Sequence, residues 1–227
     1  MQNQSIYILY VKRLLDIIIS SLLLIILSPL LLFIAILVRF KLGTPVIFKQ
    51  SRPGKNEIVF DMYKFRTMTN ERDEFNNLLS DEERLTNFGK MLRSTSLDEL
   101  PELWNILKGD MSVVGPRPQL IRDMWFMTDE QRKRHQVLPG LTGFAQISGR
   151  NRITWEEKLS LDLEYVEEVS FLFDLKIFFG SLKKVILKED IVSTGFETAE
   201  DLGEYLLREK KITKDDFNKI MEKYCDG

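Results

Sequence analysis

Cysteine and histidine are almost absent from this chain of 227 residues, in which Cys225 and His135 are the single examples. One cysteine excludes a disulfide within the chain, which is typical of a reducing compartment. One histidine excludes a metal site built from several histidines and argues against a Ser-His-Asp triad chosen from several candidates. Acid–base chemistry must therefore come from carboxylates, lysines or a substrate.

A large excess of either charge is also missing, because the formal net charge is only −2. Composition therefore gives no reason to expect a nucleic-acid partner. The charge is uneven, since residues 190–227 hold ten acidic and six basic side chains, a net of −4, which leaves residues 1–189 near +2. This acidic tail has the pattern of two short helices, and we expect it to mediate self-association or docking. Its deletion from residue 195 is expected to leave any activity nearly intact.

Charge is absent altogether from Ile17 to Val38. These 22 residues would form a helix of about 33 Å, long enough to cross a membrane, and too long for the apolar region of a signal peptide. Ser28-Pro29 interrupts the run, and we expect a kink there, softened by a hydrogen bond from Ser28 to a backbone carbonyl. Basic residues flank both ends: Lys12, Arg13, Arg39 and Lys41. The positive-inside rule therefore favours neither exit side, so a spanning and a re-entrant helix both remain open.

The following residues predict a small β-hairpin, with strands over Val46–Gln50 and Ile58–Phe65 and a turn between them. Further on, the pattern predicts a polar amphipathic helix over Thr154–Val169. The stretch Phe171–Leu187 combines large apolar groups with three lysines. It fits a helix in the membrane interface or a core helix, and the pattern does not separate the two.

The stretch "STSLDELPELWNILKGD" places Asp98 and Glu99 beside each other, just before Pro101. A short helix should follow the proline and end at Gly109, with an apolar stripe of Leu103, Trp104 and Leu107. The two carboxylates can be read as helix-capping groups, with Ser96 and Glu99 as a capping box. They can also be read as catalytic or metal-binding groups, and the stretch alone leaves both readings open.

Basic side chains recur beside glycine or proline or in rigid turns, as in "SRPG", "YKFR", "GPRP" and "GRNR". Guanidinium groups match phosphate oxygens in geometry, and a fixed backbone positions them. Four cationic candidates for phosphate contacts follow: Lys64, Arg93, Arg117 and Arg150. Together with the apolar run and the acidic pair, they indicate a phosphate-bearing substrate at a bilayer surface, with a divalent cation on Asp98 and Glu99.

Four stretches carry a resemblance to a known family: "KRLLDIIISSLLLIILSPLLL", "QSRPGKNEIVFDMYKFRTM", "LRSTSLDELPELWNILKGDMSVVGPRPQL" and "LPGLTGFAQISGRN". From about residue 11 to 188 the chain resembles the small monotopic phosphoglycosyl transferases of the bacterial sugar transferase family. The resemblance implies transfer of a sugar-1-phosphate from a UDP-sugar to undecaprenyl phosphate, with release of UMP. It also implies a re-entrant helix broken at Ser28-Pro29, at the cytoplasmic face of the bacterial inner membrane.

The resemblance further implies that Asp98 is a nucleophile and forms a covalent phosphosugar intermediate. Glu99 would orient Asp98 or share Mg²⁺ with it, and Asp174 lies where the family tends to place an aspartate. The donor sugar is expected to be an N-acetylated amino sugar, with galactose-type donors still open. Two alternatives stay open: a larger hexose-1-phosphate transferase with extra membrane helices, and a non-catalytic scaffold that recruits downstream glycosyltransferases through the tail.

Sequence and resemblance together predict a helix-rich α+β fold with a re-entrant membrane helix, a small β-hairpin and amphipathic interfacial helices. We divide the chain into three parts: the membrane helix at 1–40, a cytoplasmic catalytic domain at 41–189 and the acidic two-helix tail at 190–227.

Overall fold

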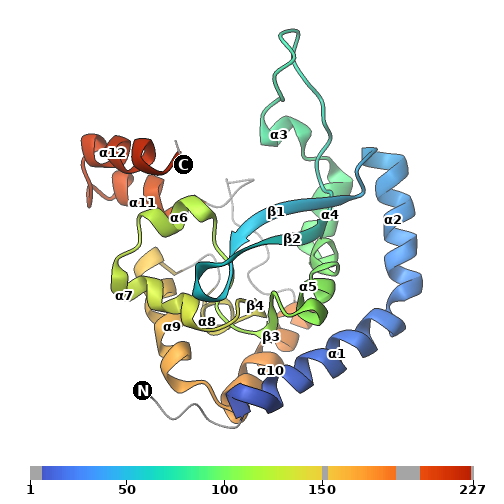
Figure 1. Cartoon of the computed structure of the whole chain (residues 1–227). Coiled ribbons are helices and arrows are strands. Elements are labelled where there is room, and N and C mark those ends of the chain that lie inside the picture. The colour runs from blue at the N-terminus through green and yellow to red at the C-terminus, as the bar shows by residue number, and fades with distance from the viewer. Residues whose placement is uncertain (1–6, 150–152, 188–199, 226–227) are drawn as a thin grey trace.

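The computed structural model describes residues 7–149, 153–187 and 200–225. Helices dominate, and a β-hairpin crosses the centre of the molecule (Figure 1). A bent pair of helices, α1 and α2, forms one flank of the molecule, and the two C-terminal helices lie on the opposite side. The helix-rich α+β class predicted from the sequence is therefore confirmed.

The apolar run folds as two helices, α1 (Lys12–Ile26) and α2 (Ser28–Leu42), after a single π-turn, η1 (Tyr7–Val11). They bend by 64° at the break, where Ser28 Oγ donates a hydrogen bond of 2.8 Å to the Ile25 carbonyl, as predicted. Among the described residues, no single helix is long and apolar enough to cross a membrane, whereas this bent pair meets both criteria together. Large apolar side chains remain exposed along it, among them Leu14, Ile18, Leu22, Ile25, Leu32, Phe33 and Phe40.

The predicted hairpin is confirmed, with β1 (Ile47–Pro53) antiparallel to β2 (Val59–Phe65). Ile47 lies opposite Phe65, and Pro53 lies opposite Val59. The turn contains a short 3₁₀ segment, η2 (Lys55–Glu57). Proline and glycine interrupt the pattern here, so the chain turns without losing register.

The acidic pair follows two helices, α3 (Asp81–Arg84) and α4 (Asn87–Ser94), and lies in a 3₁₀ turn, η3 (Leu97–Glu99). Helix α5 (Glu102–Lys108) comes next and ends at Gly109, whose φ of 98° is in the left-handed region. Glycine adopts this conformation without steric cost, so it ends the helix as predicted. The predicted apolar stripe is wrong in part: Leu103 and Ile106 are buried, whereas Trp104 is 53% exposed. The core lies against the Leu103–Ile106 side of the helix, which turns Trp104 outward.

A second sheet of two short parallel strands joins β3 (Ser112–Val114) to β4 (Gly140–Thr142). The sequence did not reveal it, because each strand has only three residues. Its two backbones approach closely at Gly115 and Gly140. A Cβ on Gly140 would lie 2.1 Å from the Gly115 nitrogen, so only glycine fits there. Between the strands lie α6 (Ile121–Trp125), α7 (Asp129–Arg132) and η4 (Lys133–Gln136).

Three helices complete the body: α8 (Phe144–Ser148), α9 (Trp155–Glu168) and α10 (Phe171–Leu187). Helix α10 contributes to the core through Ile177, which is fully buried, yet Leu172 is 75% exposed. One face of the helix therefore belongs to the core, and the interfacial role of its exposed face stays a prediction. The main core joins residues from β2, α5, β3, α9 and α10: Met62, Leu103, Ile106, Met111, Val113, Val114, Tyr165 and Ile177.

The described part of the tail forms the two expected short helices, α11 (Leu202–Arg208) and α12 (Lys214–Cys225). They lie against α6, in the red part of Figure 1. A separate apolar cluster holds them to the body: Met127, Trp155, Leu159, Leu202 and Tyr205.

Candidate active site

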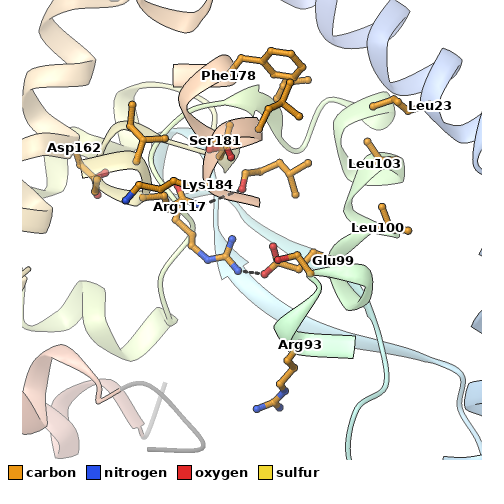
Figure 2. Close-up of a pocket in the computed structure, with 18 of the residues that line it drawn as sticks. Leu23, Arg93, Glu99, Leu100, Leu103, Arg117, Asp162, Phe178, Ser181 and Lys184 are labelled. Atoms are coloured by element: carbon orange, nitrogen blue, oxygen red, sulfur yellow. Dashed lines mark hydrogen bonds and ion pairs between the residues drawn. The ribbon is translucent and has the colours of Figure 1, made fainter. Parts of the chain in front are cut away.

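A cavity of about 560 Å³ lies between the end of α1, the acidic turn and helices α8 to α10 (Figure 2). We call the apolar part of its lining the apolar wall, which includes Leu23, Leu27, Leu100, Leu103, Phe178 and Leu182. We call the polar part the polar wall, which includes Arg93, Glu99, Arg117, Lys158, Asp162 and Lys184. Leu23 and Leu27 belong to α1 and its junction with α2, so the apolar wall continues into the bent helix pair. The cavity can therefore hold a ligand with both an apolar part and an anionic part.

Glu99 lies on the cavity wall between two cations that come from distant parts of the chain. Its Oε1 accepts a hydrogen bond of 2.9 Å from Lys64 Nζ on β2. It accepts another from Arg117 Nη2 (Figure 2). Burial by itself would raise the pKa of Glu99, but Arg117 and Lys64 outweigh it and hold that pKa well below its usual range. Glu99 is therefore a fixed negative charge at neutral pH.

The capping-box reading of this turn is wrong. Ser96 has a left-handed backbone with φ 55°, and its side chain makes no capping hydrogen bond to η3. Glu99 is turned instead toward Lys64 and Arg117, because two full charges attract its carboxylate more strongly than a neutral backbone N–H.

Asp98 is buried beside Glu99, with 7% of its surface exposed. Its Oδ1 atom has no hydrogen-bond partner among the described residues. Burial raises the pKa of Asp98 to about 6, and Glu99 adds to the effect against the opposing charge of Lys64. Asp98 does not itself line the cavity in this conformation, whereas its neighbour Glu99 does. The site thus pairs a carboxylate that is easily protonated with one that stays ionised.

Glu102 is a third carboxylate, which sequence analysis missed. It is fully buried, and its Oε1 lies 3.2 Å from Lys64 Nζ without hydrogen-bond geometry. Burial raises its pKa to about 7, although Lys64 counteracts the shift. The spacing of four residues from Asp98 was a signal that could have revealed it, since such a spacing places two side chains on the same side of a helical segment.

The remaining predicted residues divide into those that reach the cavity and those that do not. Arg93 lines it, and its Nε donates a hydrogen bond of 3.0 Å to Thr67 Oγ1. Arg150 lies outside the described residues. Asp174 is not among the residues that line the cavity.

Asp174 instead forms a buried contact between α10 and the start of α1. It accepts a hydrogen bond of 2.7 Å from Tyr165 and forms an ion pair with Lys12. The structure therefore places Asp174 outside the cavity lining, and the phosphate-binding role that the resemblance implied for it stays a prediction. A carboxylate favours a cation over a phosphate, and here Lys12 lies within reach.

A buried ion pair between Arg134 and Asp162 supports the polar wall, and no pattern in the sequence indicated it. Asp162 Oδ2 accepts hydrogen bonds from Arg134 Nε at 3.0 Å and Nη2 at 2.7 Å. Arg134 Nη2 also donates a hydrogen bond of 2.6 Å to the Arg117 carbonyl. This network fixes the backbone from which Arg117 reaches Glu99.

The single histidine is not part of this arrangement. His135 is buried, and its Nδ1 lies 3.3 Å from Glu57 Oε1. Burial and the neighbouring Arg134 lower the pKa of His135 to about 4, so the ring is neutral at physiological pH. Proton transfer in the cavity must therefore involve other groups.

Whether the acidic pair fits Mg²⁺ depends on which carboxylate oxygens are available. No group of three metal-ligating side chains occurs in the part of the chain that the structure describes. Magnesium in phosphate-processing sites often takes only one or two protein carboxylates together with substrate phosphates. The unpartnered Oδ1 of Asp98 fits that requirement, whereas Glu99 is already held by two cations.

Fold and site together place a carboxylate pair and several cations next to a cavity beside a bent apolar helix pair. The sequence profile of the bacterial sugar transferase family matches residues 7–188, which is most of the chain. The chain therefore belongs to the bacterial sugar transferase family.

Several relatives are similar over most of this range. The uncharacterized sugar transferase EpsL of Bacillus subtilis is 50% identical over 190 residues, which cover 84% of this chain and 94% of the relative. A UDP-glucose:undecaprenyl-phosphate glucose-1-phosphate transferase of Klebsiella pneumoniae is 44% identical over 183 residues, 76% of this chain but only 39% of that protein. The galactosyl transferase CpsE of Streptococcus agalactiae is 39% identical and is matched over 43% of its length. Relatives thus include proteins of similar size and much longer ones.

Proposed function

We propose that this protein is a phosphoglycosyl transferase that moves a sugar-1-phosphate from a UDP-sugar to undecaprenyl phosphate and releases UMP. The carrying observation is a single cavity whose lining combines apolar side chains, some of them from the bent helix pair, with cations and carboxylates. The apolar wall suits the lipid acceptor and the basic wall suits phosphates. Relatives named as undecaprenyl-phosphate glucose-1-phosphate transferases, from Klebsiella pneumoniae and Escherichia coli, support the same reaction.

In the proposed first step, a carboxylate oxygen of Asp98 attacks the β-phosphorus of the UDP-sugar. The bond from that phosphorus to the bridging oxygen breaks, and UMP leaves with the oxygen. In the second step an oxygen of undecaprenyl phosphate attacks the same phosphorus, and the Asp98 carboxylate is released. The raised pKa of Asp98 supports this role, because a more basic carboxylate is a better nucleophile while remaining mostly ionised above about pH 6.

Glu99, Lys64 and Arg117 prepare the site for an anionic donor. Glu99 holds the two cations in place, and their positive charge faces the phosphoryl oxygens in the proposed complex. Arg93 and Arg150 are proposed as further phosphate contacts. Mg²⁺, for which Asp98 Oδ1 is the fitting ligand, would neutralise charge on the phosphoryl oxygens when bound.

We further propose that α1 and α2 form a re-entrant element at the cytoplasmic face of the inner membrane. The 64° bend and the basic residues at both ends support it, since both ends then stay on the side where positive charge is favoured. Cysteines introduced at residues 2 to 8 should react with an impermeant reagent only from the cytoplasmic side. Labelling from the periplasmic side would contradict re-entry.

The central experiment incubates the purified enzyme with donor alone and measures UMP and the mass of the quenched protein. We expect one equivalent of UMP and a sugar-phosphate adduct on Asp98, and neither in an Asp98→Asn variant. If UMP appears only when undecaprenyl phosphate is present, the covalent route is wrong. If Asp98→Asn transfers sugar phosphate as well as wild type does, Asp98 is not the nucleophile.

Family membership does not determine which donor sugar the protein uses. Relatives are named for glucose-1-phosphate and for galactosyl transfer, whereas the sequence resemblance favours an N-acetylated amino sugar. A screen of UMP release over UDP-glucose, UDP-galactose and N-acetylated UDP-sugars identifies the donor by the largest kcat/KM.

A further inference from the structure

The C-terminal helices lie outside residues 7–188, the range that matches the family, yet they are firmly joined to the body. Leu202 is 2% exposed and Tyr205 is 7% exposed, and both pack against Trp155 and Leu159 of α9. Such burial is not expected of a solvated appendage.

Polar contacts add two further connections between this tail and α6. The backbone N–H of Leu202 donates a hydrogen bond of 2.9 Å to Asp123 Oδ1, and Arg122 Nη2 lies 2.7 Å from Asp201 Oδ2. The other carboxylate oxygen of Asp123 accepts a hydrogen bond of 2.8 Å from the backbone N–H of Leu120. One buried carboxylate therefore connects the tail directly to the first residues of α6.

The first residues of α6 follow immediately after a segment that lines the cavity. Arg117 and Gln119 both lie on the cavity wall, and Leu120 is the residue from which α6 begins. The tail thus holds the C-terminal end of the segment that carries Arg117, while Arg134 holds its carbonyl from the other side.

Contacts to α9 connect the tail to the same wall by a second route. Trp155 Nε1 donates a hydrogen bond of 3.3 Å to the Glu200 carbonyl, and Tyr205 donates one of 2.5 Å to Glu156. Further along α9, Lys158 and Asp162 line the cavity. Both elements that carry the polar wall are therefore braced by residues 200–211.

We propose that residues 200–211 act as a clamp that positions Arg117, through α6 and α9, for binding of the anionic donor. The clamp is a positioning element, since none of its residues lines the cavity. This inference rests on the proposed function in one respect, namely that Arg117 binds the diphosphate of the donor. It departs from the expectation from sequence that deletion of the tail leaves activity nearly intact, because loss of the clamp raises the donor KM even where kcat is preserved.

Gly203 offers a way to undock the clamp without touching the cavity. A Cβ at this position would lie 2.6 Å from the nearest ring carbon of Phe126, so a larger side chain must displace that ring or push α11 away from α6. Glu204 is the next residue on the same helix and is exposed, which makes Glu204→Val a matched control for Gly203→Val.

In full-length protein, Gly203→Val should raise the donor KM about fivefold with kcat changed less than about twofold, and Glu204→Val should change neither. Hydrogen exchange of residues 116–125 should become faster in Gly203→Val alone. In an Arg117→Lys background, Gly203→Val should add no further rise in KM, because its effect passes through Arg117. If Gly203→Val raises KM by the same factor in the Arg117→Lys background as in wild type, the clamp is refuted. An unchanged KM in a variant whose tail shows fast hydrogen exchange would refute it as well.

Asp201→Asn provides a second variant if Gly203→Val does not fold. It keeps a helix-capping side chain but removes the ion pair with Arg122, and the same changes in KM and exchange are expected. Hydrogen exchange needs no turnover. Absence of transfer in wild type would therefore refute the proposed function, while exchange at residues 116–125 would still decide whether the clamp exists.

Discussion

Glu99 and Glu102, three residues apart and both close to Lys64, should affect stability with opposite signs when each is replaced by glutamine. Glu99 has a lowered pKa because Arg117 and Lys64 outweigh the effect of burial. Glu102 has a raised pKa, to about 7, because burial outweighs the attraction of Lys64. Folding therefore favours the ionised form of Glu99 and the neutral form of Glu102.

The magnitude for Glu102 follows from its pKa of about 7 against the usual value of 4.5. Each pKa unit corresponds to about 1.4 kcal/mol, so ionised Glu102 lowers the free energy of unfolding by at most about 3 kcal/mol. Because the folded pKa is raised, full stability is present below pH 4.5 and is lost as the pH rises through 7. Glu102→Gln should therefore match wild type near pH 4.5 and be more stable at pH 8.

Thermal unfolding in detergent at several pH values measures this difference. For a chain of this size, a gain of about 3 kcal/mol would raise Tm by about 6–12 °C at pH 8, which is an upper bound. Glu99→Gln should lower Tm at pH 8, and its deficit should shrink at acid pH because the ionised form of Glu99 is the stabilising one. If both variants shift Tm in the same direction at pH 8, or if the Glu102→Gln gain does not depend on pH, the electrostatic reasoning is refuted.

Three further outcomes are expected. Donor kcat/KM should fall as the pH drops through about 6, the pKa of Asp98, because protonation removes the nucleophile; a rate that is flat from pH 8 to 5 would contradict this. Asp162→Asn should lower the free energy of unfolding by about 3–5 kcal/mol, since it leaves the Arg134 charge buried and unpaired. Denaturant titration measures the loss, and a loss below about 1 kcal/mol would show that the pair is not structurally important. Gly109→Ala should cost about 1–2 kcal/mol, because alanine is strained at φ 98° and its Cβ would lie 3.2 Å from Arg13 Nη2; an unchanged Tm would show that this helix end can relax.

The sequence predicted the local features of the fold well. The hairpin follows from alternating strand residues around Pro53-Gly54, and both strands form within three residues of the predicted bounds. The break at Ser28-Pro29 and the helix end at Gly109 also depend on single residues whose backbone preferences are strong. Such features need only neighbouring residues, so they can be recognised without the fold.

Some of the predicted site residues are brought close together by the fold, while their role as phosphate contacts stays a prediction. Lys64, Arg93 and Arg117 come from three separate segments, and the structure brings all three to the acidic turn or the cavity. Asp174 differs from them, because the resemblance indicated a role for it, whereas only the fold pairs its carboxylate with Lys12.

By itself, the sequence determined that this protein has a broken apolar helix pair, a hairpin and an acidic turn with basic companions, because periodicity, proline and glycine act over a few residues. The tertiary structure alone decided the ionisation of the three carboxylates and the place of the tail. Glu99 and Glu102 have the same side chain, but their pKa values shift in opposite directions. Arg117 and Lys64 lower the pKa of Glu99, whereas burial raises the pKa of Glu102 against the attraction of Lys64. Residues 200–211 likewise became part of the site's support because the fold places α6 and α9 where their apolar side chains can be buried.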